Sequence, residues 1–285
     1  MHKNQYFNKY RLQQIEQQEL ERKWRVFNEE QEMSMMRFIN FSNGNDGGGA
    51  LDPNIEFTFK SDSTELYIYP ENYNGVSIID WGDGMVEEFI DGDEAMHTYD
   101  KGNNDLITIK ISIPPGSSLD LGGEITEITF DKLYNLESLD LGGNQLTSFD
   151  SILPSGLVSL RLTSNQLTSF NSILPSGLVS LFLNENQLTS FDSVLPSGLV
   201  ILSLYNNRLT SFDSVPPSGI YSLDLANNQL NTAEVNSTLI LLDSSPLTGS
   251  FAVFTLEMDP IAPPSGAGLT AKTNLQAKGF AVYTD

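Results

Sequence analysis

The apolar positions from Leu136 onward repeat with a strict period of 21 residues. Each unit follows the pattern L-x-x-L-x-L-x-x-N-x-L-T-S-F-x-S-x-x-P-S-G, with some drift in the last unit. Successive side chains of a strand point to opposite faces, so L-x-L places both leucines on the same side. The pattern therefore predicts one short strand per unit, stacked as a parallel sheet along one wall of a solenoid. The units start at Leu136, Leu157, Leu178, Leu199 and Ile220.

Two further columns of residues complete each unit. An asparagine follows each strand, and we expect its amide to satisfy backbone groups that the corner of the coil leaves unpaired. A phenylalanine comes later and is expected to fill the far end of the coil. The two columns are Asn144, Asn165, Asn186, Asn207 and Asn228, and Phe149, Phe170, Phe191 and Phe212. With these columns the unit resembles the short bacterial leucine-rich repeats of surface proteins and secreted effectors.

The repeat region is predicted to span residues 116–243, of which 136–240 follow the 21-residue period. A solenoid needs a cap at each end, because its end coils would otherwise expose their interior. At the N-terminal end, Ile125, Ile128 and Phe130 reproduce the spacing I-x-x-I-x-F. We interpret them as a truncated first coil that rests against the preceding domain.

At the other end the pattern decays after Leu230. Residues 266–284, GAGLTAKTNLQAKGFAVYT, predict a short helix followed by an alternating strand. Residues 244–285 are therefore the predicted C-terminal cap.

Residues 52–115 are predicted to form a small β-domain. Apolar residues alternate with polar ones in its first and last long segments, which indicates half-buried strands. The alternating positions are Ile55, Phe57 and Phe59, and Ile107, Ile109, Ile111 and Ile113. Between these segments lie Asp80-Trp81-Gly82-Asp83-Gly84 and, further on, His97-Thr98-Tyr99. The combination resembles the PKD-type immunoglobulin-like domain, which implies a small β-sandwich that serves as a spacer or an adhesive module.

Residues 1–41 are predicted to form an anchoring helix, and the glycine-rich residues 42–51 a hinge. Glycine and proline are absent from the first of these segments, and strong helix formers dominate it. One helix face carries Tyr6, Tyr10, Leu20, Trp24 and Phe27, and a second apolar stripe carries Leu12, Ile15, Val26 and Met33. A lone helix cannot bury two stripes, so we interpret it as a docking element. A helix folded back on its own domain and a frayed tail are the alternatives. The expected fold class is thus mainly β, with this N-terminal α-helix, an Ig-like sandwich and a capped leucine-rich repeat solenoid.

Charge separates the N-terminal segment from the remainder of the chain. The whole chain of 285 residues carries 15 basic and 37 acidic residues, a net charge of −22. Seven of those bases and six of those acids fall in residues 1–39, which leaves the remainder at −23. A surface with this much negative charge repels the phosphate backbone of nucleic acids, so nucleic-acid binding is not expected.

Several classes of site are excluded by composition. The chain has no cysteine, so disulfides, thiolate metal sites and cysteine nucleophiles are excluded. His2 and His97 are the only histidines, which excludes a histidine-rich zinc site. The N-terminus lacks the apolar region of a standard secretory signal. No apolar run approaches the roughly 20 residues of a membrane-spanning helix, so membrane insertion is not expected.

The candidate binding residues lie on the concave face of the predicted solenoid. Arg161, Phe182 and Tyr205 are the large side chains in columns of mostly small ones, and residues of these types are common in binding interfaces. Asn184 and Asp224 complete the candidate ligand-binding set. Ordinary surface variation is the alternative interpretation of all five.

Neither a catalytic site nor a cofactor is expected. An acidic cluster in the β-domain is interpreted as a solvated surface, with a calcium site as the alternative, although its spacing is not that of an EF-hand loop. The cluster comprises Asp80, Asp83, Glu87, Glu88, Asp91, Asp93 and Glu94. His97 has no nucleophile partner at a defined spacing and is expected to make a structural hydrogen bond in the H-x-Y turn.

The layout of an anchor, a hinge, an Ig-like module and repeats resembles that of bacteriophage structural proteins. The resemblance implies a non-enzymatic virion protein, made in the host cytoplasm and possessing no signal peptide. Its expected partners are other virion proteins, through the N-terminal helix, and a host-surface glycan or protein, through the repeats. The chain could form an oligomer in the particle, and the repeats could decorate the particle instead of binding the host. The rival hypothesis is a bacterial surface or secreted effector protein that binds a host protein, and a third is a cytoplasmic scaffold.

Overall fold

The computed structural model divides into two compact units, Met1–Ala50 and Leu51–Asp285. The structure describes residues 55–285, apart from short gaps at 62, 64, 72–75, 91–94, 100–105, 114–115, 135, 249–252, 257 and 259–260. The predicted anchoring helix and hinge, with the candidate anchor residues Tyr6, Tyr10, Leu20, Trp24 and Phe27, lie outside the described residues. None of the helices that the structure describes is long and apolar enough to cross a bilayer.

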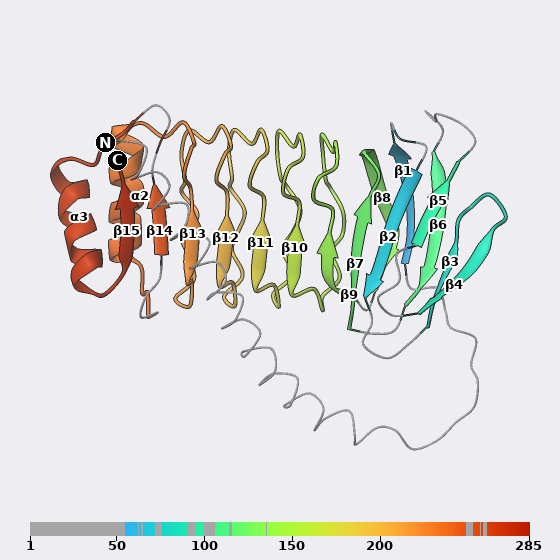
Figure 1. The fold of residues 1–285 in the computed structure, drawn as a ribbon. Helices are drawn as coiled ribbons and strands as arrows, with labels where there is room; N and C mark the ends of the chain where they lie inside the picture. Colours follow the sequence, from blue (N-terminus) through green and yellow to red (C-terminus); the bar gives the residue numbers. More distant parts are fainter. Residues whose placement is uncertain are drawn as a thin grey trace, which may run out of the picture. The chain divides into compact units, whose positions relative to one another are not determined.

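The N-terminal β-domain contains an antiparallel five-stranded sheet in the order β4-β3-β6-β1-β8 (Figure 1). Its strands are β4 (Val86–Ile90), β3 (Val76–Asp80), β6 (Ile107–Ser112), β1 (Ile55–Ser61) and β8 (Ile125–Leu133). The predicted alternation is confirmed in β1, where Ile55, Phe57 and Phe59 are buried and the residues between them are half-buried. This alternation gives the sheet one apolar face.

The apolar face of this sheet packs against strands of a second sheet, β5 (Ala95–Thr98), β2 (Glu65–Glu71) and β7 (Ser117–Gly122). Trp81, just after β3, stacks on His97 of β5 with ring centroids 4.8 Å apart. Phe59 of β1 contacts Tyr99 with centroids 6.2 Å apart. The two sheets therefore share one core.

The chain from residue 117 to residue 133 differs from the predicted truncated coil. Ile125, Ile128 and Phe130 lie in β8, a nine-residue strand that pairs antiparallel with β1. Most coils of the solenoid contribute only three strand residues and pair parallel, whereas this nine-residue strand pairs antiparallel along the whole length of β1. Ile128 and Phe130 therefore complete the β-domain. Ile125 also takes the coil position of the prediction, because its N–H donates to Oδ1 of Asn144 as the N–H of Leu146 does to Asn165.

Strand β7 joins the β-domain to the repeats. It pairs antiparallel with β2 on one side and parallel with β9 (Leu136–Asp140) on the other. The sequence SLDLGG at residues 118–123 recurs at 138–143, and the structure sets Leu119 beside Leu139. The first rung of the solenoid is thus also a strand of the β-domain. One ten-stranded sheet in the order β15-β14-β13-β12-β11-β10-β9-β7-β2-β5 runs through both regions.

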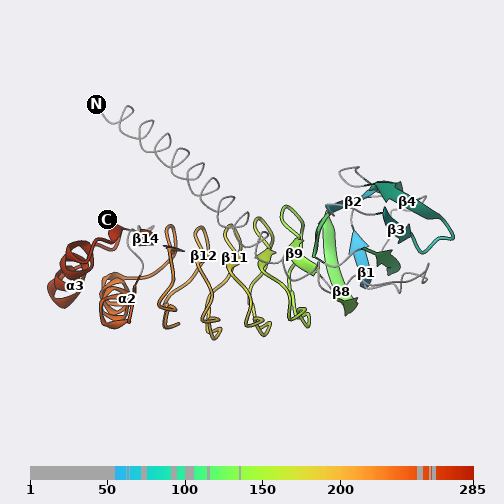
Figure 2. The same cartoon turned by 90° about the horizontal axis from the view of Figure 1, so that it is seen from below.

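The repeats form the predicted stack of coils, each with one short parallel strand (Figure 2). The strands after β9 are β10 (Ser159–Arg161), β11 (Ser180–Phe182), β12 (Ile201–Ser203) and β13 (Ser222–Asp224). Both leucines of every L-x-L are at most 1% exposed, so their predicted inward direction is confirmed. The phenylalanine column is likewise buried, and Phe191 and Phe212 stack with ring planes 6° apart.

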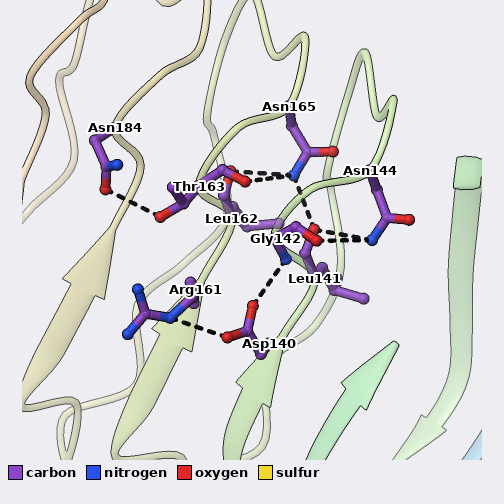
Figure 3. Close-up of polar contacts among 9 residues, drawn as sticks. All are labelled: Asp140, Leu141, Gly142, Asn144, Arg161, Leu162, Thr163, Asn165 and Asn184. Atoms are coloured by element: carbon purple, nitrogen blue, oxygen red, sulfur yellow. Dashed lines mark hydrogen bonds and ion pairs between the residues drawn. The ribbon is translucent and has the colours of Figure 1, made fainter. Parts of the chain in front are cut away.

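The asparagine column performs the predicted backbone role at the corner after each strand (Figure 3). The amide nitrogen of Asn165 donates to the carbonyls of Leu141 and Leu162 at 2.8 and 3.2 Å. Its Oδ1 accepts a hydrogen bond from the backbone N–H of Leu146 at 2.9 Å. Each side chain thus ties its own coil to the preceding one, and Asn144, Asn186, Asn207 and Asn228 repeat the arrangement.

The C-terminal region continues the sheet with longer units that contain helices. The order is α2 (Thr232–Ser244), β14 (Val253–Leu256), α3 (Gly266–Ala277) and β15 (Ala281–Thr284), with β13, β14 and β15 parallel. The predicted helix and strand of residues 266–284 are thus present as α3 and β15. The two helices pack closely, because Gly268 lies against Asn236, where a β-carbon would be 2.0 Å from the side-chain oxygen.

The candidate binding face of the repeat sheet

The outward face of the parallel sheet carries a row of side chains at the carboxyl ends of successive strands. Parallel pairing without a register shift from β9 to β13 sets these positions side by side. The row, which we call the sheet-face row, is Asp140, Arg161, Phe182, Ser203 and Asp224. The structure therefore brings together two of the large candidates, Arg161 and Phe182, as direct neighbours.

Arg161 is held between an acid and an aromatic ring. Its Nε lies 2.9 Å from the Oδ2 of Asp140, and its guanidinium carbon lies 4.3 Å from the centroid of the Phe182 ring (Figure 3 shows the ion pair). The side chains of Arg161 and Asp140 are still 44% and 32% exposed. The arginine is thus oriented by both neighbours, while much of its side chain remains accessible to a partner.

Asp140 is supported from the backbone as well. Its Oδ1 accepts the N–H of Gly142 at 2.8 Å. Burial raises the pKa of Asp140, and the Gly142 hydrogen bond and the charge of Arg161 offset only part of this effect. A β-carbon at Gly142 would lie 3.0 Å from the Asp140 carboxylate and 3.6 Å from the Arg161 stem. The glycine therefore leaves room for the ion pair.

Tyr205 lies on the next column and belongs to a second polar group. Its hydroxyl donates to Oε1 of Glu185 at 2.9 Å, and Ser164 donates to Oε2 of the same carboxylate at 2.6 Å. Burial raises the pKa of Tyr205 to about 12, and the Glu185 hydrogen bond and the charges of Glu185 and Asp224 act in the same direction. The phenol therefore stays protonated, and its hydroxyl is oriented by Glu185.

The other two candidates play supporting parts. Asn184 is only 4% exposed, and its Oδ1 accepts a hydrogen bond from Thr163 at 3.0 Å. Asp224 is half-buried and accepts the backbone N–H of Ala226 at 3.0 Å, as Asp140 does with Gly142. Both residues orient polar groups of the face rather than offering large contact surfaces.

Asp140 and Glu185 are not among the residues predicted from the sequence, although both orient the large candidates. Glu185 occupies the column before each asparagine, where the backbone φ is positive in every repeat. That column is Gly143, Ser164, Glu185, Asn206 and Asn227. The other residues of this column are small or carry an amide, as is usual in a turn with positive φ. A glutamate in such a column is unusual, and this difference was the available sign that Glu185 has a specific role.

Three acidic side chains of the cluster, those of Asp80, Asp83 and Glu87, accept local hydrogen bonds. Asp83 contacts the ring of His97 at 2.7 Å and accepts the N–H of Met85, while the indole N–H of Trp81 donates to Glu87 at 2.8 Å. His97 is buried between these groups, so its predicted structural hydrogen bond is present. Among the described residues, no three histidine, aspartate or glutamate side chains gather closely enough to hold a metal ion.

Comparison with known proteins bears on the repeats alone. The Leucine Rich Repeat family model matches residues 135–157, which span the first coil. No curated protein matches the chain. The family match, the recurrence of the same unit over five coils and the stacked parallel strands together make this chain a repeat protein with a solenoid fold.

Proposed function

We propose that this chain is a non-enzymatic binding protein of a bacteriophage particle, and that its repeat sheet recognises the host surface. The observation that carries the proposal is the pre-oriented group of Arg161, Phe182 and Tyr205 on an otherwise small-residue sheet. Repeat solenoids commonly use such extended faces for binding. Arginine and tyrosine are also frequent among the side chains that dominate binding energy.

The chemistry of the face favours a neutral glycan or a protein loop. Arg161 and Tyr205 contribute polar groups and apolar ring or stem surface together, as do many adaptable recognition surfaces. Strands lie about 4.8 Å apart, so the three coils that carry these residues span roughly 10 Å, which is suited to a short glycan segment or a loop. The net charge of −22 disfavours anionic polysaccharides.

Removing the large side chains should abolish attachment with little change in fold. The sheet-face variant combines Asp140→Asn, Arg161→Ser, Phe182→Ser and Tyr205→Ser. The first change avoids leaving a half-buried carboxylate unpaired, and its amide oxygen still accepts the Gly142 N–H. We expect attachment of the labelled full chain to host cells to fall by about tenfold or more. Attachment equal to that of the parent would contradict the proposed binding face.

The setting in a phage particle is supported by the resemblance in layout and by the different charge of the N-terminal segment. We expect mass spectrometry of purified particles to detect the chain, and a variant without residues 1–41 to be absent from them. A chain absent from particles but present in culture medium would favour the bacterial effector instead. The sheet-face variant should still join particles, so a failure of attachment and a failure of incorporation are distinguishable.

A further inference from the structure

A line of exposed aliphatic side chains runs along the repeats on the side away from the parallel sheet. The same position in four consecutive coils carries a β-branched residue, which is almost completely open to solvent in the first three coils and exposed in the fourth. The residues, which we call the aliphatic ladder, are Ile152 (92% exposed), Ile173 (90%), Val194 (91%) and Val215 (61%). Single exposed aliphatic residues are ordinary on protein surfaces, whereas a contiguous line of them indicates an interaction site.

The ladder is not a requirement of the coil's own packing. The first three ladder residues precede Leu153, Leu174 and Leu195, which are buried or packed against the core, and the fourth precedes the buried Pro216. These residues already fill the interior at this position. A hollow of about 420 Å³ lies between the first two coils at this point, lined by Ile152, Ile173 and their neighbours. At these two coils the ladder therefore borders an indentation with a partly apolar lining.

A parallel line of acids accompanies the ladder. Asp150, Asp192 and Asp213 stand two residues before their ladder residues and are exposed, while Asn171 takes the same place in the second coil. Two residues span at most about 7 Å, so each acid lies within a long side chain's reach of the ladder. Within the described residues, no lysine or arginine forms an ion pair with these three aspartates.

The spacing of the coils selects the conformation of an occupant. The nearly parallel rings of Phe170, Phe191 and Phe212 lie three residues before their ladder residues, and their centroids repeat at 6.4 Å. Alternate residues of an extended chain repeat at about 6.6–6.8 Å. One turn of an α-helix rises about 5.4 Å, so the side chains of a bound helix would shift relative to the coils by about 1 Å in each repeat.

We propose that the aliphatic ladder binds an extended, basic segment of a partner protein that carries apolar side chains at every second position. The apolar side chains lie on the ladder, and the lysines or arginines between them reach around to the aspartate line with their long stems. A second copy of this chain is disfavoured, because its own acids would face these aspartates. This surface is separate from the sheet-face row, so the inference goes beyond the proposed function.

The test uses synthetic peptides and the full chain. The first peptide alternates five lysines with four valines. A second has the same composition with its valines at helical spacing, and a third alternates glutamate with valine. We expect the first peptide to bind more tightly than the other two by about tenfold or more, as measured by fluorescence anisotropy. Equal or tighter binding of the helical or acidic peptide, or no binding of the first, would overturn the proposal.

Variants locate the binding. Changing the four ladder residues to serine should weaken binding of the first peptide by about tenfold or more. A matched control changes four exposed aliphatic residues elsewhere to serine and should leave binding within about twofold. The control residues are Val86, Leu106, Ile261 and Leu269. Equal losses in the ladder and control variants would mean non-specific adhesion and would overturn the proposal.

Charge and self-association are tested in the same way. Asp150→Asn, Asp192→Asn and Asp213→Asn together should weaken binding and reduce its salt dependence more than Glu88→Gln, Glu124→Gln and Asp131→Asn. The sheet-face variant should bind the peptide like the parent. If the parent chain is a dimer in sedimentation and the ladder variant is a monomer, the occupant is a second copy and the proposal is wrong.

Discussion

Leu183→Asp is expected to unfold the repeat array. Leu183 is completely buried in the middle coil, so the substitution places a carboxylate in an apolar interior without a partner. Burying such a group costs several kcal/mol, roughly, which is comparable to the whole stability of many domains. Because each coil is stabilised by its neighbours, the loss should spread along the array. Thermal and denaturant unfolding followed by circular dichroism would measure the effect.

Two companion variants calibrate this result. Leu183→Met nearly conserves volume and polarity, so it should cost less than about 1.5 kcal/mol. Asn186→Ala should cost about 1–3 kcal/mol, because it leaves the buried N–H of Leu167 without its acceptor and removes one of the two amide donors at each of the carbonyls of Leu162 and Leu183. A Leu183→Asp protein that melts together with the parent would show that the leucines of the L-x-L strands do not point inward.

Gly123→Ala is expected to have a comparably large effect at the junction of β-domain and repeats. Gly123 has a φ of +133°, and a β-carbon there would lie 2.4 Å from the backbone oxygen of Glu65 and 3.2 Å from the Cα of Leu66. The strained backbone and the overlap with strand β2 together should cost about 3–5 kcal/mol. Because β2 and the rung strand β7 are both affected, the β-domain and the first coil should lose stability together.

Gly143→Ala is the matched control for this prediction. Gly143 also has a positive φ, +69°, but no atom lies within 4 Å of where its β-carbon would be. Gly143→Ala should therefore lower the stability by only about 1 kcal/mol, which is the cost of placing alanine instead of glycine at a positive φ. Denaturant unfolding curves of the two variants separate the contributions. Equal losses of stability would mean that the contact between Gly123 and β2 is unimportant.

The repeated part of the fold was predictable because five units impose the same requirement at every column. The inward leucines and the asparagine and phenylalanine columns all followed from that agreement. The rung at β7 was missed because SLDLGG at 118–123 stands 20 residues before its copy at 138–143, outside the strict period. Its flanking strand β8 then pairs with β1, a contact that no local pattern indicates.

Helix α2 was missed for a different reason. Its apolar residues crowd together in STLILLDSS, so the weak periodicity concealed the buried face. That face is Val235, Thr238, Leu239 and Leu242, which has helical spacing. The N-cap Asn231, whose side chain accepts the N–H groups of Ala233 and Glu234, was the available start signal.

The candidate site was predictable in position but not in organisation. Period and register place Arg161 and Phe182 side by side on the sheet, because parallel strands one repeat apart carry equivalent positions next to each other. The pairing of Arg161 with Asp140 and of Tyr205 with Glu185 depends on side-chain conformations between coils. Column patterns do not specify such conformations.

The proposed function requires that the repeat sheet, rather than the aliphatic ladder, recognises the host surface. Attachment of labelled full chain to host cells, measured side by side for the parent, the sheet-face variant and the ladder variant, tests it most directly. We expect attachment of the sheet-face variant to fall by about tenfold or more and attachment of the ladder variant to equal that of the parent. Retention of attachment by the sheet-face variant would contradict the proposed binding face, and its loss in the ladder variant would place host recognition on the ladder instead.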